Sequence, residues 1–158
     1  KIKFGKRTAE NYDSKQLILE ASILKNFFLN DKNHIQARFK INHLKSNNYL
    51  ENELFRTGGV NSIRGFEENS ILTNSFLLVN LEYTYGLNDE LSVYPLFDLM
   101  HTANKIQRTI ENLYAFGLGL KIKKNNYNLD LNYTVGGVYN NKNENLKSKI
   151  SVILKTGI

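Results

Sequence analysis

Residues 75–86 read Ser-Phe-Leu-Leu-Val-Asn-Leu-Glu-Tyr-Thr-Tyr-Gly, and apolar and polar side chains alternate along them. Every odd position from Leu77 to Tyr85 is apolar or aromatic, whereas the even positions from Asn80 to Thr84 are polar. Successive side chains of an extended chain point to opposite faces, so this alternation predicts a β-strand with one apolar and one polar face.

The same alternation extends over most of the chain. It recurs in the segments 1–8, 16–29, 33–45, 90–101, 113–124, 127–135 and 147–158. The first of these is the weakest, because only Ile2 and Phe4 mark its apolar face. Helical periodicity is almost absent. The sequence therefore predicts an all-β chain with about eight strands, each roughly nine to thirteen residues long.

Length and composition narrow the class further. A chain of 158 residues fits one domain, and 41% hydrophobic residues are enough for a folded core. The absence of Cys excludes disulfides and thiolate chemistry. No apolar run approaches the length of a transmembrane helix, and Lys1-Ile2-Lys3-Phe4 does not resemble a signal peptide. The chain does not begin with Met, which is compatible with a piece of a longer protein. The net charge of +6 is attributed to solvated lysines.

Alternation by itself leaves open which face is buried. A soluble sandwich or a lipocalin-like barrel hides the apolar face, whereas an outer-membrane barrel turns it toward lipid. Strand length favours the membrane, because most segments exceed the usual length of soluble strands and match the length needed to cross a bilayer.

The connections point the same way. Short turns are expected near 30–32, 87–89 and 124–126, and they alternate with longer loops near 9–15, 46–74, 102–111 and 139–146. Short periplasmic turns and longer external loops are typical of outer-membrane barrels. This arrangement predicts that the first strand runs outward and that the carboxyl terminus lies on the periplasmic side.

Aromatic residues on the apolar face are the third indication. Several stand near strand ends, where outer-membrane barrels carry interfacial girdles; they are Tyr83, Tyr85, Tyr114, Phe116, Tyr127 and Tyr133. The ordinary preference of aromatic residues for strands explains them equally well.

The longest loop, 46–74, contains the most unusual sequence. It carries six large apolar residues, which indicate that the loop folds back against another surface: Leu54, Phe55, Val60, Ile63, Phe66 and Ile71. The pair Gly58-Gly59 permits backbone conformations with positive φ. The alternative is a mobile external loop.

Arg64 in this loop requires an acidic partner if it is buried. Glu82 and Asp98 are candidates, because they lie on the polar faces of two strands joined by the turn at 87–89. A hairpin register centred on that turn places them near each other, where one guanidinium can bridge both. The alternative is two hydrated carboxylates without a shared partner.

The stretch Gly58-Gly59-Val60-Asn61-Ser62-Ile63-Arg64-Gly65-Phe66 resembles the signature loop of the BamA/TamA superfamily of outer-membrane insertases and translocases (bacterial surface antigen barrels). The resemblance implies that the tip, Ile63-Arg64-Gly65-Phe66, folds into the barrel lumen. It also implies that Arg64 meets Glu82 and Asp98 there. The run 53–59 and the residues 69–71 resemble versions from Bacteroidetes-type bacteria.

Two strands after the loop share the likeness in part. Asn80-Leu81-Glu82-Tyr83 is similar to the family's following strand. The segment Leu96-Phe97-Asp98-Leu99-Met100 resembles the family's Phe-x-Asp-x-Gly element, with Leu96 in place of Phe and Met100 in place of Gly. The family often ends in an aromatic residue, whereas this chain ends Lys155-Thr156-Gly157-Ile158.

The resemblance implies an antiparallel transmembrane β-barrel of sixteen strands, with the signature loop after the eleventh. Three predicted strands precede the loop and five follow it, so residues 1–158 correspond to strands nine to sixteen. The amino-terminal strands and periplasmic POTRA domains are expected outside this sequence. The implied function is assembly, insertion or translocation of proteins at the bacterial outer membrane.

The implied mechanism uses a lateral seam at the last strand, 147–158, where Lys149, Ser151 and Gly157 are expected to keep the polar face loosely packed. The implied partners are outer-membrane lipids, unfolded outer-membrane or secreted client proteins, and accessory assembly subunits. Alternatives are a two-partner-type secretion pore, a plain eight-stranded outer-membrane barrel or porin, and a soluble all-β binding protein.

Other motifs predict no enzymatic activity, cofactor, metal or nucleic-acid partner. His34, His43 and His101 lack metal-site spacing. Gly117 and Gly119 are predicted to make room in the lumen, not to bind phosphate.

Two charged groups are assigned no chemistry. Glu67-Glu68 is predicted to be a solvated loop pair. The basic residues Arg38, Lys40 and Lys45 have their aromatic neighbours on the opposite face, which disfavours nucleic-acid binding.

Overall fold

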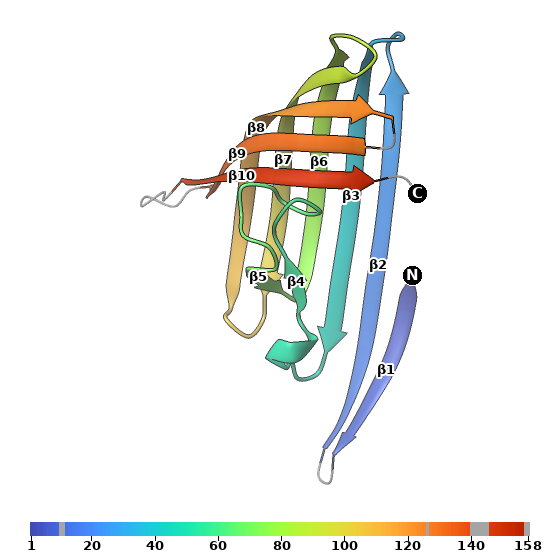
Figure 1. The fold of residues 1–158 in the computed structure, drawn as a ribbon. Coiled ribbons are helices and arrows are strands. Elements are labelled where there is room, and N and C mark those ends of the chain that lie inside the picture. Colours follow the sequence, from blue (N-terminus) through green and yellow to red (C-terminus); the bar gives the residue numbers. More distant parts are fainter. Residues whose placement is uncertain (10–11, 126, 140–145, 157–158) are drawn as a thin grey trace.

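The computed structural model describes residues 1–9, 12–125, 127–139 and 146–156. Eight strands form one antiparallel sheet in the order β1–β2–β3–β6–β7–β8–β9–β10 (Figure 1). Their bounds are β1 Ile2–Ala9, β2 Tyr12–Phe28, β3 Asn33–Ser46, β6 Ser75–Gly86, β7 Leu91–Asn104, β8 Thr109–Lys124, β9 Tyr127–Val138 and β10 Lys147–Thr156. The prediction of an all-β chain with eight main strands is confirmed.

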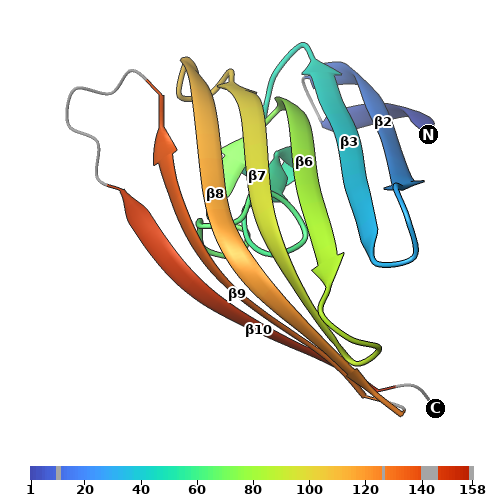
Figure 2. The same cartoon turned by 90° about the horizontal axis from the view of Figure 1, so that it is seen from above.

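The loop between β3 and β6 has structure of its own. It contains the short 3-10 turn η1 Glu51–Glu53 and two short strands, β4 Phe55–Thr57 and β5 Ile71–Thr73, which pair antiparallel with each other. Residues 58–70 form the tip between β4 and β5. The sheet is curved, and the loop lies within its curve, so we call this side of the sheet the concave face (Figure 2).

The prediction of long loops at 9–15 and 102–111 is wrong. Thr8 pairs with Asp13 and Ala9 with Tyr12, so β1 and β2 continue through most of the expected loop at 9–15. β7 and β8 likewise extend to Asn104 and from Thr109, which leaves only residues 105–108 as their connection. The alternation fades in these segments, but backbone hydrogen bonds extend a ladder without apolar side chains. Short and long connections therefore do not alternate strictly.

The other connections agree better with the prediction. Residues 29–32 and 87–90 form short turns, and the short turn after β8 includes residue 126, which lies outside the described residues. Residues 47–74 form the long loop. β9 ends at Val138 and β10 begins at Lys147, but residues 140–145 of the predicted loop 139–146 are not described.

The sheet exposes its apolar face and buries much of its polar face. Apolar side chains of the convex face are exposed across the sheet; examples are Ile23, Phe39, Leu77, Leu81, Phe97, Leu99, Phe116, Leu118, Tyr133, Ile150, Val152 and Leu154. The concave face buries polar side chains instead; examples are Asn42, Asn80, Thr84, Asp98, Thr102, Asn132 and Thr134. The loop covers this polar face.

β1 and β10 form the two edges of the sheet, and no pairing between them occurs among the described strands. The predicted last strand, 147–158, is described only to Thr156, so Gly157 lies outside the described part of the chain. Within that part, no helix is long and apolar enough to span a membrane.

Candidate functional site

Arg64 stands at the tip of the long loop and is only 5% exposed. A tight backbone turn presents it to the sheet: the Ser62 N–H donates to the Gly59 carbonyl at 3.0 Å, and the Gly59 N–H donates to the Ile63 carbonyl at 3.0 Å. Gly59 has φ +92° and Gly65 has φ +82°. Residues with a Cβ rarely adopt these backbone angles, so the glycines on both sides of Arg64 permit the shape of the tip.

Arg64 is bound to both predicted carboxylates. Its backbone N–H and Nε donate to Asp98 Oδ2 at 3.0 and 2.8 Å, and Nη2 donates to Asp98 Oδ1 at 2.5 Å. Nη1 donates to Glu82 Oε1. The structure therefore brings Arg64, Glu82 and Asp98 together as predicted, with Asp98 fully buried.

The strand register explains why two carboxylates meet one guanidinium. Asp98 on β7 is the partner of Asn80 on β6, so Glu82 lies diagonally across on the same face. Diagonal neighbours on a sheet are within reach of long side chains. Asn80 also binds the loop directly, because its Nδ2 donates to the Ser62 carbonyl at 2.9 Å.

The Arg64 guanidinium keeps its positive charge although it is buried. Burial alone lowers the pKa of Arg64, but the hydrogen bond to Asp98 and the negative charges of Asp98 and Glu82 outweigh burial, so this pKa is raised above its ordinary value. The guanidinium stays protonated at any physiological pH. The contact is therefore a permanent ionic anchor.

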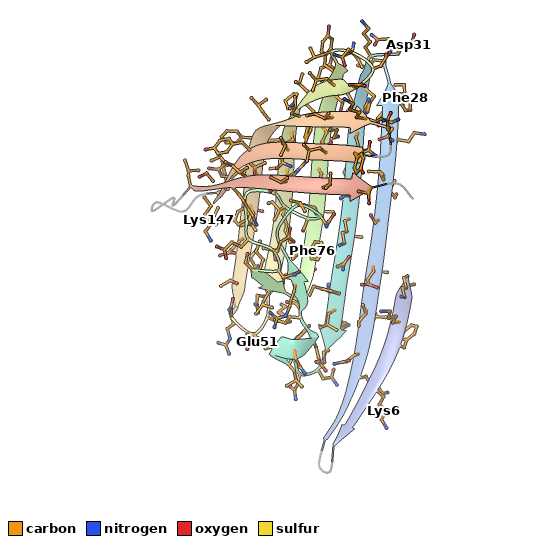
Figure 3. All side chains as sticks on the ribbon, in the orientation of Figure 1. Lys6, Phe28, Asp31, Glu51, Phe76 and Lys147 are labelled. Atoms are coloured by element: carbon orange, nitrogen blue, oxygen red, sulfur yellow. The ribbon has the colours of Figure 1, made fainter. Side chains whose placement is uncertain are left out.

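Apolar contacts hold the rest of the tip. Ile63 and Phe66 are buried in a cluster with apolar residues of β6, β7 and β8. The whole cluster comprises Ile63, Phe66, Phe76, Leu78, Met100, Leu113 and Ala115, with Phe55, Ile71 and Val138 packed against it. Phe55 meets Phe76 edge to face at 6.1 Å between ring centroids, and Figure 3 shows Phe76 beside the loop. The expectation that the loop folds back against another surface is confirmed.

The predicted glycines have distinct packing roles. A Cβ on Gly58 would lie 2.5 Å from the Glu67 carbonyl, and one on Gly59 would collide with the carboxylate of Glu68. Glu68 accepts a hydrogen bond from the Val60 N–H at 2.8 Å. The pair Glu67-Glu68 was predicted as solvated only; both side chains are exposed, but Glu68 also fixes the loop backbone.

The tip also reaches β9 and β10, which the sequence analysis missed. A Cβ on Gly65 would lie 3.0 Å from the Gly136 backbone N, and one on Gly136 would lie 2.8 Å from the Phe66 ring. Lys149 Nζ donates to the Phe66 carbonyl at 3.4 Å. Glycine at position 136, on the concave face of β9, is the only sequence signal of this close approach.

The expectation of a loosely packed polar face on β10 is wrong for Ser151, one of its three residues. Ser151 is buried, whereas Lys149 is half-buried and its Nζ donates to the Phe66 carbonyl of the loop tip. Ser151 is the register partner of the buried Asn132 on β9. Gly157, the third, is not described.

Three further polar residues extend the anchor and were not singled out from the sequence. Lys121 Nζ on β8 donates to Glu82 Oε2 at 2.9 Å and lies 4.2 Å from the ring centroid of Tyr94 on β7. The Tyr94 hydroxyl donates to Asp130 on β9. Each stands on the concave face of its strand, which was the available signal.

The histidines singled out from the sequence make separate contacts in the structure, and His34 packs against the Phe28 ring. His34 and His43 lie at positions of opposite parity on β3, and His43 and His101 contact Ser75 and Asn112. No cluster of metal-ligating side chains occurs among the residues that the structure describes. Gly119 makes room as predicted, because a Cβ there would collide with the Tyr94 ring. The ion pairs of Arg64 with Asp98 and Glu82, together with the apolar cluster around Ile63, can hold the loop against the concave face.

No protein-family model matches the chain, and no curated protein matches it.

Proposed function

We propose that residues 1–158 form the carboxyl-terminal part of an outer-membrane β-barrel of the BamA/TamA type, which inserts or translocates other proteins. One observation carries the proposal: a sheet with an apolar convex face holds on its polar concave face a glycine-flanked loop through Arg64, Glu82 and Asp98.

The orientation of the faces supports the membrane part of the proposal. Soluble proteins rarely expose large contiguous apolar surfaces, and such surfaces mark contact with a membrane or another protein. Here the apolar residues of seven neighbouring strands, from β2 to β10, are exposed on one face. The opposite face buries polar groups, as the lumen side of an outer-membrane barrel does.

The free edges support the half-barrel part. β1 pairs with β2 only up to Leu19, and Glu20 N–H donates to the Lys1 carbonyl, so the outer edge of β2 beyond Glu20 has no partner among the described strands. The outer edge of β10 is likewise unpaired there. Eight further strands would occupy both edges of a sixteen-stranded barrel.

The mechanism requires no covalent chemistry. An unpaired strand edge at β10 offers backbone donors and acceptors, and an incoming client strand can pair with them. Arg64 does not act on the client. It holds the loop against the concave face next to β9 and β10, and so sets the rigidity of the wall beside the seam.

Placing a charge in the middle of the convex face tests the membrane location. Leu118 is 67% exposed at mid-strand of β8, and Ile110 is 72% exposed near the start of the same strand on the same face. In a bilayer, Leu118→Arg is expected to lower the free energy of unfolding by about 2–4 kcal/mol, and Ile110→Arg by only about 0–1 kcal/mol.

Urea unfolding of the protein refolded into lipid vesicles measures both values. On a water-facing surface the two substitutions would each change stability by only about 0.5 kcal/mol. Equal, small effects together with recovery in the aqueous fraction without detergent would contradict the membrane location and favour a soluble binding protein.

Depletion of the protein in cells tests the transport role. Loss of many outer-membrane barrels is expected for an insertase, whereas loss of one exported protein would indicate a dedicated secretion pore. The intact mass of the polypeptide in outer-membrane extracts separates a third case. A mass several times 18.2 kDa is expected, and a mass near 18.2 kDa would favour a small self-contained barrel.

A further inference from the structure

Glu82 binds two cations at once. Its Oε1 accepts from Arg64 in the loop, and its Oε2 accepts from Lys121 on β8 at 2.9 Å. Asp98, in contrast, is occupied by three donors of Arg64 alone. Glu82 is therefore the member of the anchor that connects the loop to a strand beyond β6 and β7.

Lys121 is itself held in position from two strands. Its ammonium lies 4.2 Å from the centroid of the Tyr94 ring, and Tyr94 is buried. The Tyr94 hydroxyl donates to Asp130, which is the register partner of Lys121 on β9. Gly119 leaves the space for the Tyr94 ring, because any Cβ there would collide with it. A cation above an aromatic face is attracted by the ring.

Lys121 supplies the second positive charge that the two carboxylates need. Arg64 and Lys121 together neutralise Glu82 and Asp98, whose side chains are 14% and 0% exposed. Without Lys121, one guanidinium would face two poorly hydrated carboxylates. Removing one partner from such a group leaves a charge uncompensated and is unfavourable.

We infer that Lys121 is a positioning residue for Glu82, and that Tyr94 and Asp130 position Lys121. These contacts couple the loop anchor on β6 and β7 to Lys121 on β8 and to Asp130 on β9. β9 is the strand that pairs with β10. This inference rests on the proposed function for its consequence: displacement of the β9–β10 hairpin during client pairing loosens the loop through Asp130, Tyr94 and Lys121.

A single introduced cysteine reports the position of the loop, because the chain contains no Cys. Ser62 belongs to the loop tip and is 7% exposed, so Ser62→Cys is expected to react slowly with a water-soluble maleimide in the folded protein. Adding Lys121→Met is expected to accelerate labelling about three- to tenfold, the range for losing one hydrogen bond of ordinary strength, because the Lys121 side chain is 34% exposed and water screens its charge. Lys121→Arg is expected to stay near the original rate.

Lys123→Met is the matched control, since Lys123 stands two residues further along the same face and is exposed. Its labelling rate is expected to equal that of Ser62→Cys alone. An unchanged rate in Lys121→Met, or equal acceleration in Lys123→Met, overturns the inference.

Two combined variants test the route of the coupling. In a Glu82→Gln background, Lys121→Met is expected to add no further acceleration, because Lys121 acts through Glu82. Asp130→Asn alone is expected to accelerate labelling by a smaller factor. An additive effect of Lys121→Met, or no effect of Asp130→Asn, contradicts the coupling.

The labelling is measured on the folded protein in detergent, so its outcome is independent of client transport. Unchanged labelling with normal transport would reject this inference alone. Accelerated labelling without a transport defect on depletion would reject the proposed function and leave the positioning role standing.

Discussion

Replacing Arg64 with Met is expected to release the loop from the concave face and to lower the free energy of unfolding by about 3–5 kcal/mol. Methionine has a similar length but no charge, so the buried carboxylate of Asp98 would lose both side-chain hydrogen bonds that Arg64 gives it. The backbone N–H would remain as a donor only while the loop stays in place. The amount of folded, heat-modifiable protein and its urea unfolding curve measure the effect.

Arg56→Met is the matched control, because Arg56 belongs to β4 in the same loop and is exposed. It is expected to change stability by only about 0.5 kcal/mol. Arg64→Lys keeps the charge but loses the planar fork, so an intermediate loss is expected. Adding Asp98→Leu to Arg64→Met is expected to recover part of the stability, because no buried charge is then unpaired.

Normal levels, full activity and an unchanged unfolding curve for Arg64→Met would contradict the anchoring role. A double variant that is no more stable than Arg64→Met would show that packing around Arg64, and not its charge, holds the loop.

Replacing Gly65 with Ala is expected to lower the free energy of unfolding by roughly 2–6 kcal/mol, from backbone strain and overpacking together. Gly65 has φ +82°, which an L-side chain rarely adopts. The added Cβ would also lie 3.0 Å from the Gly136 backbone N on β9. Neither the strand nor the tip can yield without disturbing the bonds of Arg64. Unfolding in urea measures the loss.

Gly136→Ala separates the two causes. It lacks positive φ but places a Cβ 2.8 Å from the Phe66 ring, so a loss of about 1–3 kcal/mol is expected. Gly5→Ala, where the nearest atom is 3.6 Å away, is the control and is expected to change stability by about 0.5 kcal/mol. If Gly65→Ala were as mild as Gly5→Ala, the close approach of tip and β9 would be refuted.

The sequence predicted the strands well where alternation is strong and poorly where it fades. The segment 75–86 and its six stronger counterparts all appear as strands of the main sheet. The side chains of residues 9 to 15 and 102 to 111 do not alternate clearly, and the sequence therefore predicts loops there. In the structure, backbone pairing continues through Thr8–Asp13 and up to Asn104–Thr109, since ladder hydrogen bonds do not depend on side-chain polarity.

The core of the anchor was also predictable, because Glu82 and Asp98 lie on one hairpin whose turn is visible in the sequence. The outer members were not. Lys121 meets Glu82 across 39 positions, and Tyr94 meets Asp130 across 36. Such contacts depend on the register of three successive strand pairs, and no local pattern specifies which lysine of β8 faces which carboxylate.

By itself, the sequence determined that the chain is all-β, that its strands have one apolar and one polar face, and that Arg64 lies in a loop too apolar to remain in solvent. The pairing of Arg64 with Glu82 and Asp98 was a prediction for the polar face, and only the tertiary structure decided that the loop does cover that face. Alternation is symmetric between the two sides of a sheet, so the choice depends on long-range contacts. Burying the tip against Glu82 and Asp98 places the polar face inside and leaves the apolar face on the convex surface.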